Sequence, residues 1–182
     1  MRGSMFVDFL ALVEEKYGVE TVDQIIARLG DELSTGGAYT SVGNYPHGEL
    51  LAMATTLSSL QSASMEAIIG EFARHLMGEF RRLHGEYFDQ AKDAFDFLMS
   101  IGEQIHIDVR KLYPDARPPE VNGENRGDDA MYLSYRSHRP LSELALALVN
   151  ETATEFGEAM DVEILSQSDD GTALELLMRR PS

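Results

Sequence analysis

Apolar residues recur at helical spacing along the first two-thirds of the chain. Phe6, Phe9 and Val13 lie three or four positions apart, which is the spacing of one buried helix face. The same spacing predicts further helices, over residues 21–29, from 46 past 57, from 64 to about 80, and over about 91–112. The N-terminal part of the chain is therefore expected to be helical.

The last third has a different pattern, in which short runs of β-forming residues replace long helical stretches. Pro118 and Pro119 mark the boundary, because a helix cannot continue through them. Strands are expected at Glu120–Val121, Met131–Ser137, Val162–Ser166 and Leu174–Arg179, with a helix over Leu141–Phe156 and turns at Asn122-Gly123 and Asp169-Asp170-Gly171. This order predicts an α+β fold: an N-terminal helical subdomain packed on a C-terminal α/β subdomain with an antiparallel sheet. We place the subdomains at about 1–62 and 63–182 of one domain.

Composition excludes several functions. The 182 residues carry 31 acidic and 15 basic side chains and a formal net charge of -16, so nucleic acid and anionic membranes are disfavoured partners. There is no apolar run long enough to span a bilayer and no signal-peptide pattern, and we expect a cytoplasmic protein. Cysteine is absent, which excludes disulfides, thiolate catalysis and Cys-type metal sites.

Tyr132, Ser134 and Arg136 alternate along one predicted strand. Residues at i, i+2 and i+4 of a strand point to the same face, so two hydroxyls and a guanidinium would lie side by side. These neutral donors with one charged fork suit a carboxylate. The alternative is an ordinary solvated face of an edge strand.

Gly102 and His106 are four residues apart on a predicted helix, and so share a face with apolar neighbours. A glycine there would let a flat group approach the backbone, and a single imidazole over an apolar surface is how proteins supply an axial ligand to haem iron. The alternative is a core histidine beside a packing glycine. A flat cofactor that carries a metal ion and two carboxylates would use all of these residues. His106 would bind the metal, the strand residues would bind the carboxylates, and Pro118 or Pro119 would press a rigid ring on the cofactor.

At these residues the sequence resembles the haem nitric oxide/oxygen binding (H-NOX) family over essentially the whole chain. The resemblance lies in the opening Met1-Arg2-Gly3, in the segment Phe97–Pro114 around His106, and in a Tyr-x-Ser-x-Arg motif at Tyr132, Ser134 and Arg136. The histidine, the Pro118-Pro119 pair and the Tyr-x-Ser-x-Arg motif follow one another in the same order as in the family. The resemblance is to the bacterial stand-alone members.

The resemblance implies a haem b sensor domain rather than an enzyme, with haem buried between the two subdomains. His106 would be the proximal iron ligand, and Tyr132, Ser134 and Arg136 would bind the propionates. The family's haem-contacting proline falls on Pro119, with Pro118 as the alternative, and Gly102 joins the haem-binding residues. Family members of this length commonly signal to a separate histidine kinase or diguanylate cyclase.

The residues on the distal side of the haem, opposite His106, decide which gas binds. Bound O₂ needs a hydrogen-bond donor there, and NO and CO do not. In oxygen-binding relatives the donor is a tyrosine just after the motif, and we align Leu141 with it. By helical phase and alignment, the other distal residues are also apolar, among them Met5, Phe9, Met77 and Ala145. We therefore expect binding of NO and CO but not of O₂, unless His75 reaches the iron.

As in the family, NO is expected to act by releasing His106 from the iron. Two other readings stay open. The chain could be an oxygen sensor on the same scaffold, or a haem-free module that uses the strand motif to bind a small carboxylate or an acidic partner segment. Adjacent carboxylates such as Glu14-Glu15 show no nucleophile–base pairing, so we expect no enzyme activity.

Overall fold

The computed structural model describes residues 1–181 and divides them into two compact units, Met1–Leu76 and the residues from Met77 onwards. The division falls inside a helix, α4 (Met65–Leu83), and not at the loop before it near residue 62, where we expected it. Within residues 1–181, no helix is both long enough and apolar enough to cross a membrane.

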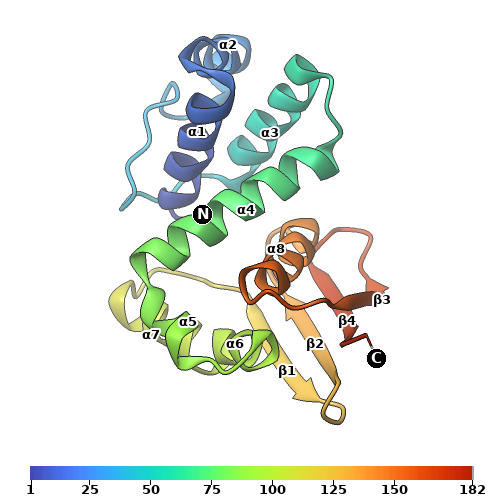
Figure 1. The fold of residues 1–182 in the computed structure, drawn as a ribbon. Helices are drawn as coiled ribbons and strands as arrows, with labels where there is room; N and C mark the ends of the chain where they lie inside the picture. The colour runs from blue at the N-terminus through green and yellow to red at the C-terminus, as the bar shows by residue number, and fades with distance from the viewer. Residues whose placement is uncertain (182) are drawn as a thin grey trace. The chain divides into compact units, whose positions relative to one another are not determined.

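The first unit is helical, as predicted. It contains α1 (Ser4–Tyr17), α2 (Val19–Leu29), a short 3₁₀ turn at Gly30–Glu32, α3 (His47–Gln61) and the first part of α4 (Figure 1). The apolar positions of the predicted helical stripes are buried: Phe6, Phe9, Val13, Ile25, Met53, Leu57 and Ile68 are at most 1% exposed. Phe9 packs edge to face on Phe72, with 5.3 Å between the ring centroids.

The Met1-Arg2-Gly3 segment has a structural role within this unit. The backbone of Arg2 forms a β-bridge with Asn44. A Cβ at Gly3 would collide with the carbonyl oxygen of Thr40, so only glycine lets the loop before α3 come this close. The N-terminus is thereby fixed against that loop.

In the second unit, a helical stretch precedes a four-stranded sheet. The helices are α5 (Gly85–Gln90), α6 (Ala94–Ser100) and α7 (His106–Leu112), with a π-helical turn at Ile101–Ile105 between the last two. We expected one uninterrupted helix over about 91–112. It starts instead at Ala94, because Asp93 caps it by accepting a hydrogen bond from the Asp96 N–H at 2.8 Å.

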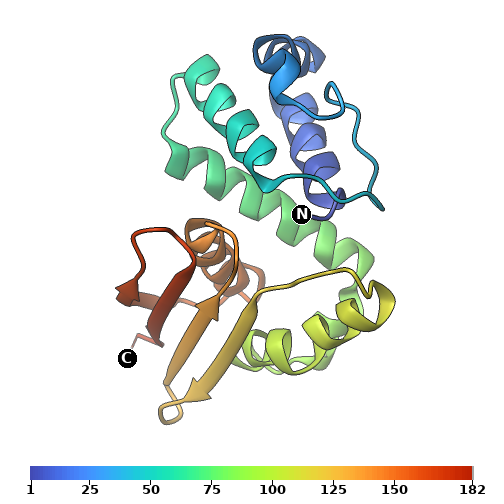
Figure 2. The same cartoon turned by 180° about the vertical axis from the view of Figure 1, so that it is seen from behind.

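The sheet is antiparallel throughout, with the order β1-β2-β4-β3. Its strands are β1 (Glu120–Asn125), β2 (Ala130–Arg136), β3 (Asp161–Gln167) and β4 (Ala173–Arg179), and α8 (Ser142–Glu155) lies between β2 and β3 in the chain. β2 therefore has a neighbour on each side, and the alternative reading of the motif as part of an edge strand is wrong. In Figure 1 α8 covers one face of the sheet, and Figure 2 shows β1 and β2 from the other side, in front of α8.

One turn prediction is confirmed and the other is wrong. Gly171 follows Asp169-Asp170 in a turn at φ +67°, where glycine is favoured. Asn122 and Gly123, however, lie inside β1. A Cβ at Gly123 would collide with the side chains of Met99 and Met131, so this glycine is needed for packing rather than for a turn.

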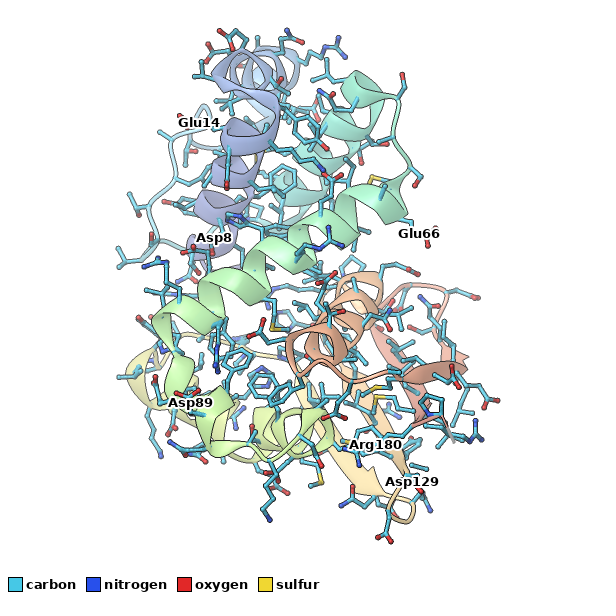
Figure 3. The ribbon with its side chains drawn as sticks, in the orientation of Figure 1. Asp8, Glu14, Glu66, Asp89, Asp129 and Arg180 are labelled. Atoms are coloured by element: carbon cyan, nitrogen blue, oxygen red, sulfur yellow. The ribbon has the colours of Figure 1, made fainter. Side chains whose placement is uncertain are left out.

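The core of the second unit lies between the sheet and its helices. Its buried residues are Phe95, Leu98, Met131, Leu133, Tyr135, Val149, Leu174, Leu176 and Met178. Arg180, directly after β4, connects the sheet to the start of α6. Its guanidinium forms an ion pair with Asp93 at 2.8 Å, and its backbone N–H donates to the carbonyl of Asp129 at 2.9 Å. Arg180 and Asp129 are labelled in Figure 3. The ends of the sheet and the start of α6 are thus held together.

Candidate haem-binding site

The three motif residues lie on one face of β2, as their spacing predicted. Met131, Leu133 and Tyr135 alternate with them and are at most 5% exposed in the core. Tyr132 and Ser134 are half-buried and Arg136 is exposed. Two hydroxyls and a guanidinium therefore project from the sheet face opposite the core.

Arg136 is the cation of this face that has no carboxylate partner. Two other arginines near the sheet face are already ion-paired, Arg126 with Glu124 at 3.0 Å and Arg179 with Glu163 at 2.7 Å. Within residues 1–181, the side chain of Arg136 makes no ion pair or hydrogen bond. A guanidinium offers five N–H donors in a planar fork that matches a carboxylate, so Arg136 can accept an external one.

Tyr132 keeps its proton. Burial raises the pKa of the phenol, and the nearby Glu175 carboxylate raises it further. The Arg126 guanidinium lies 5.5 Å from the centre of the Tyr132 ring. Tyr132 is consequently a neutral hydrogen-bond donor at physiological pH.

An open pocket adjoins Tyr132 on the same side of the sheet. Its volume is about 480 Å³, and its lining residues are Arg126, Ala130, Tyr132, Leu165, Leu177 and Arg179. Three of these are apolar and two are cationic. The motif therefore borders a concave, partly apolar surface at its Tyr132 end.

His106 begins α7, directly after the π-helical turn. Its own N–H bonds to the carbonyl of Ile101, five residues back, and closes that turn. Single π turns inside α-helices occur frequently at functional sites. A π turn contains one residue more than an α-helical turn and so changes which side chains share a helix face. Gly102 and His106, four residues apart, therefore do not share a face as they would in a regular α-helix.

The imidazole of His106 is in the form that binds metals. Burial lowers its pKa to about 4, and the nearby Arg110 guanidinium lowers it too, so the ring is neutral at physiological pH. Its Nδ1 is buried without a hydrogen-bond partner. The backbone of Pro119 lies close to the ring and acts against this lowering of the pKa.

These features fit a haem ligand. A metal-binding histidine donates one N–H to a backbone carbonyl or carboxylate and offers its other nitrogen to the metal. Within residues 1–181, no three His, Asp or Glu side chains gather to hold an ion by themselves. A single free imidazole nitrogen suits a metal that brings its other donors with it, as haem iron does.

The structure brings His106 and Arg136 to the same end of the β1–β2 pair. Pro119, whose backbone lies beside the imidazole, directly precedes β1, and the first residue of β1, Glu120, is the register partner of Arg136. Tyr132 pairs with Glu124 toward the far end of β1. His106, the predicted iron ligand, and Arg136, the predicted carboxylate-binding residue, are thus linked through the consecutive residues Pro119 and Glu120.

Gly102 packs closely against β1, and its assignment to haem binding stays a prediction. A Cβ there would collide with the carbonyl oxygen of Val121 in β1. The close approach that glycine permits is therefore made by a strand, and not by a flat ring. The alternative reading of a packing glycine accounts for this residue.

The predicted distal residues come from both units. Met5 and Phe9 lie on α1 in the first unit, half-buried and buried respectively, and Met77 is 7% exposed in the second. Leu141 is half-buried and directly precedes α8, and Ala145 packs against the sheet core. Pro118 and Pro119 are both half-buried. The assignment of these residues to haem stays a prediction.

Three features of the site were not found from the sequence: the π-helical turn, the backbone of Pro119 beside His106, and the carboxylate of Glu175 near Tyr132. The first two depend on backbone geometry, which no residue type signals. For Glu175, the alternation Glu175–Leu177–Arg179 could have indicated a polar face on β4, but its register against β2 was unknown.

Comparison with known proteins places the chain in one family. The Haem-NO-binding family (HNOB) matches residues 2–164. "Soluble guanylate cyclase 89Db" of Drosophila melanogaster is 28% identical over 95% of this chain and 26% of its own length, and "Soluble guanylate cyclase 89Da" is 25% identical over 86% and 23%. The chain thus spans about a quarter of the curated relatives it matches.

Solved structures show the same fold. The Fe(II) unliganded H-NOX protein from K. algicida is 31% identical with a TM-score of 0.89, covering 100% of this chain and 97% of that one. The H-NOX protein from S. oneidensis in the Fe(II)NO ligation state has a TM-score of 0.86 at 20% identity, with 100% of both chains covered. Since the family match extends over most of the chain, this protein belongs to the Haem-NO-binding (H-NOX) family.

Proposed function

We propose that this chain is a haem-based sensor of nitric oxide. Haem b is held by His106 as its one protein ligand and by Tyr132, Ser134 and Arg136 at its propionates. The observation that carries the proposal is the state of His106: a neutral imidazole whose Nδ1 is buried without a hydrogen-bond partner. An ordinary core histidine would have satisfied both nitrogens.

Each residue has a defined task. Bound haem supplies a ferrous iron that can take up a diatomic gas. His106 provides the imidazole, and the backbone of Pro119 lies beside its ring. Arg136 supplies the charged fork for a propionate, and Tyr132 and Ser134 supply neutral donors. Pro119, whose backbone lies beside the imidazole, is also the better placed of the two prolines to contact the haem.

The preference for NO rests on the distal side. Leu141 cannot donate a hydrogen bond, and Met5, Phe9, Met77 and Ala145 are also apolar. A site lined by these residues lacks the donor that stabilises bound O₂. NO and CO bind without one.

The signal passes through the helix that carries His106. His106 would hold the haem iron at the first residue of α7, and loss of that bond would leave α7 free to change its orientation. α7 directly follows the π turn, where the helical hydrogen bonding already changes register. The output is read by a separate protein, for which a histidine kinase or diguanylate cyclase is the family precedent.

Anaerobic reconstitution with haem tests this proposal. The reduced protein should show the Soret absorption of a five-coordinate ferrous haem, shift on addition of NO or CO, and show no stable oxygenated form in air. A stable oxygenated spectrum would favour the oxygen-sensor alternative. Absence of Soret absorption after haem is supplied would favour a haem-free carboxylate-binding module, which the unpaired Arg136 would also suit.

A further inference from the structure

A hydrogen bond between two helices holds the first turn of α7. Tyr87 on α5 donates from its hydroxyl to Oδ2 of Asp108 at 3.1 Å, and Asp108 lies in the first turn of α7, just after His106. The two bonded residues are 21 positions apart in the chain, and their helices lie beside each other in Figure 1. The bond therefore connects the helix of the predicted iron ligand to a separate element.

α7 is held by few other side-chain contacts. None of its residues, His106–Leu112, is fully buried, and Ile107 and Leu112 are 38% and 70% exposed. Asp108 also accepts a hydrogen bond from Lys111 through Oδ1 at 3.0 Å, but this pair stays inside α7. Within residues 1–181, no other side-chain hydrogen bond or ion pair joins α7 to another helix. One bond thus restrains a largely exposed helix.

The Tyr87 end of this bond is fixed in an aromatic cluster. The Tyr87 ring stacks on Phe80, with 6.1 Å between the ring centroids. Phe80 in turn packs edge to face on Phe88 at 5.5 Å, and Phe88 is buried in the core of the second unit with Phe97. The hydroxyl of Tyr87 is therefore a donor attached to that core, and it can keep Asp108 in one place.

We propose that Tyr87 is a positioning residue for the bond between His106 and the haem iron. Its hydrogen bond to Asp108 keeps the first turn of α7, and with it His106, in place, and so opposes the movement of α7 that accompanies release. This inference rests on the proposed function, because it needs His106 to bind haem iron. It gives a residue on another helix, outside the haem-binding motifs, a part in the response to NO.

The expected effect follows from the positions that α7 can occupy. His106 can rebind the iron only while α7 is in its resting position, so rebinding weakens as that position becomes less populated. A hydrogen bond can shift this population by no more than its own free energy. Because 30% of the Asp108 side chain is exposed to solvent, we expect a change of about three- to tenfold when the bond is removed.

Tyr87→Phe tests this inference, because it removes the hydroxyl and keeps the ring in its stack. The reduced, haem-reconstituted protein is mixed with NO, and the absorption spectrum follows the conversion of six-coordinate haem, with His106 still bound, into the five-coordinate form. The variant should raise the rate of this conversion about three- to tenfold. Where both forms persist, the final ratio of five- to six-coordinate haem should rise by the same factor.

Tyr17→Phe is the matched control for a lost bond between a tyrosine and a carboxylate. The Tyr17 hydroxyl donates to Glu71 at 2.5 Å, and both residues lie in the first unit. This variant loses a bond of the same kind without touching α7. Its conversion rate and final ratio should therefore equal those of wild type.

Variants of Asp108 test whether the two residues act through one bond. Asp108→Ala should match Tyr87→Phe, and the double variant should exceed neither, because the interaction is already lost in each single variant. Asp108→Asn keeps an acceptor oxygen for the hydroxyl and should lie closer to wild type. Lys111→Ala removes only the pair inside α7 and should behave as wild type.

Hydrogen exchange of the haem-free protein measures the restraint on α7 without iron. The amides of α7 should exchange faster in Tyr87→Phe than in wild type, because local opening is no longer opposed by the bond to Asp108. The amides of α1 should exchange at the wild-type rate in this variant. A structural loss spread over the whole protein would accelerate exchange in both helices.

A Tyr87→Phe protein with the conversion rate and final ratio of wild type would overturn the inference, as would an equal effect of Tyr17→Phe. If the wild-type protein nevertheless binds haem and NO, the proposed function stands without this role for Tyr87. If the wild-type protein binds no haem, the proposed function fails and the inference fails with it, whatever the exchange of α7 shows.

Discussion

The imidazole of His106 lies beside the backbone of Pro119, and the next residue, Glu120, is the β-sheet partner of Arg136. The residue that would hold the iron and the residue that would hold a propionate are therefore connected through a single short piece of backbone. A change in the position of α7 would move the imidazole relative to Pro119, which directly precedes β1. This link gives a ligand-induced movement of His106 a direct path to the sheet.

Replacing Gly102 by alanine should weaken the fold of the second unit. The added methyl group would collide with the carbonyl oxygen of Val121, and overpacking against backbone costs about 2 kcal/mol. Chemical denaturation of the haem-free protein measures the loss. Gly78→Ala is the control, because nothing lies within 4 Å of its Cβ position on α4, and there the free energy of unfolding should rise by about 0.5–1 kcal/mol. A Gly102→Ala protein as stable as wild type would show that the strand contact is not needed.

Replacing Arg136 by alanine should accelerate haem loss by about 10- to 100-fold, because hydrogen bonds to charged groups contribute about 1.5–3 kcal/mol. Transfer of haem to apomyoglobin provides the rate. Arg179→Ala removes an arginine that is paired with Glu163 on the same sheet and should change the rate little. Equal rates of haem loss for the two variants would mean that Arg136 has no specific role, and that the arginines of this sheet face retain haem only through their positive charge.

Replacing Leu141 by tyrosine should give a protein that forms a stable complex with O₂, since the phenol supplies the missing distal donor. Leu141→Phe, which adds the ring without the hydroxyl, should behave as wild type. Spectra of the reduced proteins in air distinguish the two. If Leu141→Tyr also fails to bind O₂, the alignment of Leu141 with the distal tyrosine of oxygen-binding relatives is wrong.

Local periodicity was sufficient for most of the fold. The alternation at Tyr132, Ser134 and Arg136 was read correctly because Met131, Leu133 and Tyr135 between them are apolar and buried. The helices were found for the same reason, through buried stripes such as Phe6, Phe9 and Val13. A side-chain pattern with a period of 2 or 3.6 records which face meets the core, and this information is present in the sequence alone.

Contacts between distant residues were not predictable in this way. Asn122-Gly123 looks like a turn locally, but Gly123 is there because Met99 and Met131 pack against it. Gly102 looks like room for a cofactor, but the carbonyl of Val121 fills that space. In both cases a glycine reports a close approach, and the sequence does not say by which group. The π-helical turn before His106 is likewise a matter of backbone hydrogen bonding and leaves no pattern of residues.

The central claim is that His106 alone holds the iron, and His106→Gly with and without added imidazole tests it most directly. The absorption spectrum of the reduced, haem-reconstituted protein is measured anaerobically, first without and then with imidazole. We predict that the variant loses the five-coordinate spectrum of wild type and regains it when imidazole fills the space left beside Pro119. A His106→Gly protein whose spectrum equals that of wild type without imidazole would contradict the account, because another residue would then be the ligand.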